Sequence, residues 1–232
     1  MFFNKFCSVF LYILQYFGSE QNLFCNEQCA ASGCKVSCDG PEGQAECYGE
    51  NCTAQTNGTS SKAKCAAKSC LSKCLNDYCS TTCAGSYCNA TCDGHPCIGN
   101  CYGLQCFSKS KGKGSKSVCV ATECHSECSQ SDKHENNQDG PGSCTSNCIG
   151  EKCLSNCSVA SCEAACDGIH CIASCKGKGC SANCYGTACT ATCEGLQCRT
   201  SINERRPITR SMTNGTDIPE DIVQILINNS TR

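Results

Sequence analysis

Cysteine is the residue type whose chemistry dominates this chain, with 33 cysteines among 232 residues. A cysteine content above about 8–10% is typical of a disulfide scaffold or of a metal-binding cluster. Zinc and copper thiolate clusters favour cysteines separated by one or two residues, and neither spacing occurs in the chain. We therefore expect disulfides, with no bound metal and no cofactor.

The cysteines belong to a nine-residue repeat of the form C-x-G-x-x-C-x-(small)-x. Four ungapped copies fill residues 166–201, and the same frame extends back to Glu20, giving about nineteen units. We number each unit so that the two cysteines occupy positions 1 and 6. Residues 56–64 and 110–118 fit the frame although both of their cysteine positions hold Ser or Thr.

These two cysteine-free units indicate how the cysteines pair. Because positions 1 and 6 are replaced together, a bond within each unit strands no thiol, whereas a bond between units would strand two. The alternative C-x3-C pairing stays open, since spacing alone does not fix connectivity. Cys25 and Cys38 are left over and can pair with each other. The predicted disulfide cysteines, in within-unit pairs, are Cys29 and Cys34, Cys47 and Cys52, Cys65 and Cys70, Cys74 and Cys79, Cys83 and Cys88, Cys92 and Cys97, Cys101 and Cys106, Cys119 and Cys124, Cys128 and Cys144, Cys148 and Cys153, Cys157 and Cys162, Cys166 and Cys171, Cys175 and Cys180, Cys184 and Cys189, and Cys193 and Cys198.

A nine-residue period argues against one helix or one flat strand, because in both of them successive units would face opposite sides. A chain that closes one coil every nine residues stacks each position on its equivalent. The predicted fold is therefore all-β or irregular: a narrow disulfide-stapled β-solenoid of about nineteen coils and about 90 Å. Positions 1, 3, 6 and 8 are expected to point inward.

The uninterrupted C-x-G-x-x-C element, for example at 166–171 and 184–189, resembles the disulfide-stacked solenoid antifreeze proteins of midges. That resemblance covers about residues 20–201 and implies a solenoid fold and an ice-binding face. This chain departs from the family pattern in having nine residues per unit instead of ten. It also has Tyr before the second cysteine only at Tyr78 and Tyr87.

The two ends lie outside the repeat. Residues 1–19 have a lysine, an apolar run and small residues, which predicts a secretory signal peptide. Its removal takes Cys7 and leaves an even number of cysteines, as a secreted disulfide protein requires.

Residues 129–143 are expected to form an exposed loop. Residues 202–232 form a polar tail, in which 217–228 can form a helix that caps the solenoid or docks on a partner. Glycosylation is predicted at Asn57, Asn89, Asn214 and Asn229.

No catalytic constellation is visible, so we expect no enzyme: the four histidines occupy unrelated positions of the unit. A net charge of −2 argues against nucleic acid as a partner, and no stretch of the mature chain is long enough to span a membrane.

The lysines at 109–116 can bind an anionic glycan or form a solvated face. Position 9, which includes Thr82, Thr91 and Asn100, is the best candidate for an ice-binding array. The sequence therefore predicts a secreted, extracellular structural or binding rod whose partners would be extracellular matrix, a glycan or ice. An ice-binding protein and a secreted effector acting on another organism are the alternatives.

Overall fold

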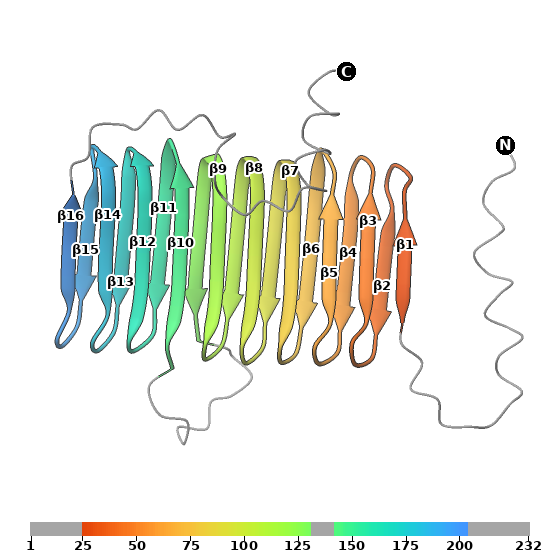
Figure 1. Cartoon of the computed structure of the whole chain (residues 1–232), viewed down its shortest axis with the longest axis horizontal. Coiled ribbons are helices and arrows are strands. Elements are labelled where there is room, and N and C mark those ends of the chain that lie inside the picture. The colour runs from red at the N-terminus through yellow and green to blue at the C-terminus, as the bar shows by residue number, and fades with distance from the viewer. Residues whose placement is uncertain (1–24, 131–141, 204–232) are drawn as a thin grey trace, which may run out of the picture.

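The computed structural model describes residues 25–130 and 142–203, and within them the chain is a parallel β-solenoid (Figure 1). The strands are β1 (Asn26–Cys29), β2 (Lys35–Asp39), β3 (Gln44–Tyr48), β4 (Cys52–Asn57), β5 (Lys62–Ala66), β6 (Ser69–Leu75), β7 (Cys79–Asp93), β8 (Cys97–Lys111), β9 (Ser115–Ser129), β10 (Cys144–Gly150), β11 (Lys152–Ser158), β12 (Cys162–Ile169), β13 (Cys171–Lys176), β14 (Ser181–Thr187), β15 (Thr190–Glu194) and β16 (Arg199–Asn203). The prediction of an all-β solenoid is confirmed.

One coil contains eighteen residues, so the prediction of nine-residue coils is wrong. Strand pairing joins residues eighteen positions apart, as Cys47 to Cys65 and Cys65 to Cys83, except across the insertion before Cys144, where the separation is 29, as Cys119 to Cys148. A nine-residue unit is a half-coil: a strand from position 6 to position 2 of the next unit, followed by a tight turn that reverses the chain. Nineteen units therefore make about nine coils, and the stack is about 45 Å long rather than about 90 Å.

Each coil is a flattened loop with two faces. Face one consists of β1, β3, β5, the first halves of β7, β8 and β9, then β10, β12, β14 and β16. Face two consists of β2, β4, β6, the second halves of β7, β8 and β9, then β11, β13 and β15. Strands of the two faces run in opposite directions in Figure 1, while neighbours within a face are parallel. The turns that lead from face one to face two form edge A, and the turns that lead back form edge B.

The interior between the faces is filled by positions 1, 6 and 8, as the sequence predicts. Positions 1 and 6 place cysteines beside each edge, and position 8 places Ala, Ser or Thr in the middle, as with Ala164 and Ala173 at 0% exposure. Small side chains suffice because disulfides hold the faces close: the bonded Cα atoms lie 5.5–6.1 Å apart.

Hydroxyl groups in the middle of the interior bond from one half-coil to the next. Ser117 donates to the carbonyl of Ser108 at 2.8 Å, and Ser126 donates to the carbonyl of Ser117 at 3.0 Å. The hydroxyl of Ser117 also lies 2.8 Å from that of Ser108, and the hydroxyl of Ser126 lies 2.9 Å from that of Ser117. Ser155 continues the pattern onto Ser146. Each buried hydroxyl therefore has a partner, which removes the cost of burying it.

Glycine at position 3 belongs to the turn rather than to the interior. At Gly168 the φ angle is +154°, and a Cβ atom built there would lie 1.6 Å from the carbonyl oxygen of Gly150 in the preceding coil. The absence of a side chain thus lets successive turns stack as closely as the strands do.

Several predictions fall outside the described residues: the signal peptide 1–19, the polar core of the 129–143 loop, the helix at 217–228, Asn214 and Asn229. Across residues 25–130 and 142–203 the structure contains no helix with the length and apolar character that membrane crossing requires.

Candidate functional site

The sulfur atoms form two columns, one along each edge. Between cysteines of residues 25–130 and 142–203 twelve disulfides are formed, and eleven of them join positions 1 and 6 of one unit. Cys128 bonds to Cys144 across the loop, and the two leftover cysteines, Cys25 and Cys38, bond to each other. So many disulfides are typical of an oxidising, extracellular environment.

The two edges differ in how strictly they keep cysteine. Edge A has a cysteine pair in every one of its nine turns, from Cys29–Cys34 to Cys184–Cys189. Both cysteine-free units and the loop insertion fall on edge B. There, the Ser61 hydroxyl donates to Thr56 Oγ1 at 3.1 Å, so a hydrogen bond joins the two positions that a disulfide joins elsewhere. Because units alternate between edges, this bias cannot be seen until the coil length is known.

Eight cysteines are buried thiols in this structure: Cys83, Cys88, Cys101, Cys106, Cys148, Cys153, Cys175 and Cys180. They make up four within-unit pairs, so the disulfides predicted for them stay predictions. Cys83, Cys88 and Cys101 lie within 4.8 Å of one another, and this group consists of thiols alone. Burial raises the pKa of Cys83, but hydrogen bonds with Cys101 and Cys88 outweigh it and lower that pKa to about 6. Burial raises the pKa of Cys88 and that of Cys101, so these two thiols are protonated at neutral pH and the group is better suited to forming disulfides than to holding a soft cation.

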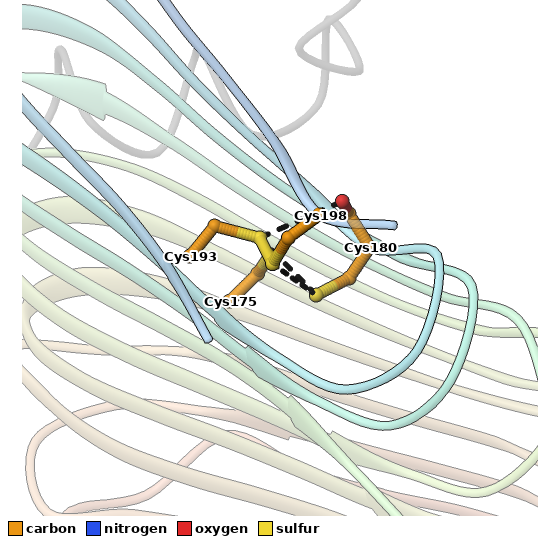
Figure 2. Close-up of side chains that lie close together, drawn as sticks. All are labelled: Cys175, Cys180, Cys193 and Cys198. Atoms are coloured by element: carbon orange, nitrogen blue, oxygen red, sulfur yellow. Dashed lines mark hydrogen bonds between the residues drawn. A yellow bond between two sulfur atoms is a disulfide. The ribbon is translucent and has the colours of Figure 1, made fainter. Parts of the chain in front are cut away.

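A second sulfur group lies at the C-terminal end of edge B (Figure 2). Cys175, Cys180, Cys193 and Cys198 point toward one another, and Cys193 is bonded to Cys198. The Cys175 sulfur lies 2.9 Å from that of Cys193, and the Cys180 sulfur lies 3.5 Å from it. Burial raises the pKa of Cys175 to about 12, so this thiol is protonated at neutral pH and is a poor metal ligand.

Stacking, not spacing, creates these sulfur groups. The prediction of no metal rested on the absence of C-x-C and C-x2-C, yet cysteines thirteen or eighteen residues apart become neighbours once coils stack. The sequence signal that could have revealed this proximity is the repeat itself, combined with the correct coil length.

Large apolar side chains gather on and beside edge A. Six of the ten large hydrophobic residues that the structure leaves exposed lie there, either in its turns or on the first outward position to either side of it: Leu71, Tyr87, Leu104, Ile149, Ile169 and Ile172. On face two the outward column nearest this edge runs Leu71, Asn89, Phe107, His125, Leu154 and Ile172 in strict register. We call the six exposed residues Leu71, Tyr87, Leu104, Ile149, Ile169 and Ile172, together with Phe107 and Leu154, the apolar edge.

A shallow groove crosses the middle of the apolar edge. It is lined by Tyr87, Asn89, Gln105, Phe107, His125 and Lys152, among others. The Phe107 and His125 rings meet edge-to-face with centroids 4.9 Å apart. Burial lowers the pKa of His125, and the Lys109 charge adds to this effect while Glu127 opposes it. His125 is therefore half-buried beside Phe107 rather than fully solvated.

Charged side chains in the groove are already paired with one another. Glu123 accepts hydrogen bonds from Lys152 at 3.1 Å and from Gln105 at 2.8 Å, and these partners lower its pKa. On the neighbouring outward column Lys109 and Glu127 form a 2.6 Å ion pair. Charge compensation of this kind leaves the groove without a strong field of either sign.

Two predicted surface patches are split by the eighteen-residue coil. Position 9 alternates between faces, so Thr82 and Asn100 lie on face one while Thr91 lies on face two, and the single ice-binding array predicted from them does not form. The lysines at 109–116 also separate, because Lys109 lies on face two and Lys116 on face one. Asn57 is exposed and Asn89 is half-buried, where it accepts a hydrogen bond from Thr91.

Comparison with known proteins finds no matching family model, no similar curated protein and no similar solved structure. The function must therefore be argued from the surfaces described above.

Proposed function

We propose that the protein is a secreted, non-enzymatic extracellular rod that binds its partner through the apolar edge. The disulfide-stapled solenoid supplies a rigid support for such a surface. Large exposed apolar patches on soluble proteins are typical of interaction sites. The observation that carries the proposal is the uneven distribution of exposed Leu, Ile and Tyr side chains: six lie on or beside edge A, against three, Tyr78, Ile98 and Leu196, on or beside edge B.

The contrast between the edges supports this choice. Edge A keeps a cysteine pair in every turn and has no insertion, whereas edge B accepts Ser and Thr at cysteine positions and a long polar insertion before Cys144. A surface that recognises a partner must hold its side chains at fixed spacing, and each turn of edge A does so at about 4.8 Å per coil. Edge B carries no comparable regularity, so it suits a solvent-facing role.

The test compares matched variants of the two edges in the full chain. The apolar-edge variant carries Leu104→Ser, Ile149→Ser and Ile172→Ser; the control carries Tyr78→Ser, Ile98→Ser and Leu196→Ser, which lie on or beside edge B and are as a set more exposed. The assay measures binding of the folded protein to a panel of matrix proteins, polysaccharides and ice. We expect a partner whose affinity falls about tenfold or more in the first variant and stays unchanged in the control.

Other outcomes would contradict the proposal. Equal losses in both variants would show that the apolar edge is not the binding surface. Absence of binding across the panel would remove the support for a binding rod and leave a structural one. Thermal hysteresis that neither variant reduces would favour ice binding through the polar faces instead.

A further inference from the structure

We propose that residues 217–228 of this chain cap the C-terminal end of the solenoid by covering β15 and β16. The inference concerns an interaction surface inside the molecule and does not depend on the binding function of the apolar edge. The proposal is based on the last coil, where residues at positions that are buried in the other coils are exposed.

The interior is open at this end. Ala182 and Cys184 are fully buried, yet the residues that stack on them in the next coil, Thr200 and Ile202, are exposed, with Ile202 at 50%. Ala191 and Cys193 on β15 are only half-buried for the same reason. An uncovered coil end also presents unpaired backbone groups of two strands, a surface that repeat proteins cover with a terminal cap.

The cysteine pattern of the coils is not continued beyond β16. Residues 202 and 207, at positions 1 and 6 of the next edge A unit, are Ile and Pro, whereas each of the nine edge A turns in the described residues has cysteine at both positions. The sequence therefore supplies no cysteine pair to close a further coil at this end.

A second copy of the chain fits this end poorly. Face one ends at β16 and face two at β15, so one strand place on face two is empty and a stacked β1–β2 pair would leave it unfilled. The N-terminal end also places Glu27 at the inward position 8 of β1, where it is exposed. Stacking would bury that carboxylate against Thr200 and Ala191, which offer no positive charge.

The tail has the right composition and length. It continues directly from β16, and the thirteen residues 204–216 can span up to about 40 Å, well beyond the width of one coil. Residues 217–228 contain Ile222, Val223 and Leu226 at helical spacing, so one side of the segment is apolar. This side matches the exposed Ile202 and half-buried Ala191.

Hydrogen exchange of the full-length protein tests the cap. The variant Ile222→Asp with Leu226→Asp places charge on the apolar side, and the control Gln224→Asp with Asn228→Asp makes the same charge change on the other side. We expect amides of β15 and β16 to exchange about tenfold faster or more in the first variant, and amides of β4 and β5 to be unaffected. The control should match the parent protein.

A photo-crosslinker at position 226 identifies what the segment contacts. Crosslinks within one chain to Leu196, Arg199 or Ile202 support the cap. Crosslinks to another copy, or to Phe107 and Leu154 on the apolar edge, would overturn it, as would β15 and β16 amides that exchange freely in the parent protein.

Discussion

The pair Ser110 and Ser115 offers a direct test of the half-coil architecture, because the structure predicts that two cysteines there will bond. These residues occupy positions 1 and 6 of edge B, stacked between the Cys92–Cys97 and Cys128–Cys144 disulfides. In both of those disulfides the Cα atoms are 6.0 Å apart. The variant Ser110→Cys with Ser115→Cys should therefore form a thirteenth bond without moving the backbone.

The expected gain in stability follows from two opposing terms. Closing a six-residue ring lowers the entropy of the unfolded chain by an amount worth about 2 kcal/mol. Against this, Ser115 no longer accepts the hydrogen bond from the Cys97 amide at 3.1 Å, and Ser110 no longer donates to the carbonyl of Lys116 at 2.7 Å. These losses cost about 1.5 kcal/mol in total, because the buried Cys97 amide is left without its acceptor. We expect a net gain of about 0.5 kcal/mol and a rise in Tm of about 1–2 °C.

The assay exploits Lys111 and Lys113, which lie inside the ring. Trypsin cuts after them, so under non-reducing conditions a bond between positions 110 and 115 keeps two fragments joined, and reduction separates them. The single variant Ser110→Cys is the control and should show a free thiol and no gain in Tm. A double variant with two free thiols, or with a bond to Cys97, would refute the assignment of positions 1 and 6 as facing neighbours.

Three further predictions concern the turns, the groove and the thiols. Gly168→Ala should lower the free energy of unfolding by about 3 kcal/mol, because its Cβ would overlap the Gly150 carbonyl. Gly179→Ala, whose Cβ would have no neighbour closer than 3.8 Å, should lower it by only about 1 kcal/mol, because of the φ of +71°. Equal losses of the two variants in urea unfolding would contradict the close stacking of turns. By NMR, His125 should titrate below its ordinary pKa of 6.5, and Phe107→Ala should raise that midpoint. Since the folded state binds this proton more weakly than the unfolded chain, the stability linked to His125 is present above pH 6.5 and decreases as pH falls toward the folded pKa; an unchanged midpoint in Phe107→Ala would remove burial by the ring as the cause. Finally, protein from an oxidising compartment should take up no thiol label after denaturation, because the four thiol pairs occupy the same positions as the bonded ones; labelled Cys83, Cys88 and Cys101 with a bound soft metal ion would show that this group acts as a ligand set instead.

The repeat frame, the inward positions and the within-unit cysteine pairs could be read from the sequence because each depends on neighbours within nine residues. Thr56 and Ser61 illustrate this: their joint replacement of two cysteines indicates a contact, and the structure joins them by a hydrogen bond. The coil length could not be read in the same way. The nine-residue period shows which residues occupy equivalent positions in the units. It does not show whether one unit completes a coil or only reverses the direction of the chain.

The step that failed was the assumption that a nine-residue unit closes one complete coil. An odd period does flip a continuous strand, but here the flip is absorbed by the turn at positions 3 to 5, where Gly168 adopts a conformation with φ of +154°. A unit that reverses the chain must alternate between two faces. Every outward column predicted from consecutive units is therefore divided, which is why the Thr82 and Thr91 array disappears.

The same alternation explains why the apolar edge could not be found from the sequence. Its members come from positions 2, 4, 5 and 7 of every second unit, so Ile149 and Ile172 share no place in the repeat frame. They meet because positions 2 and 7 of one unit flank the same turn, and every second turn lies on edge A. An edge with two cysteines in every turn and no insertion is the place where a rod can hold such side chains at constant spacing, so architecture and recognition are linked there by the same eighteen-residue coil.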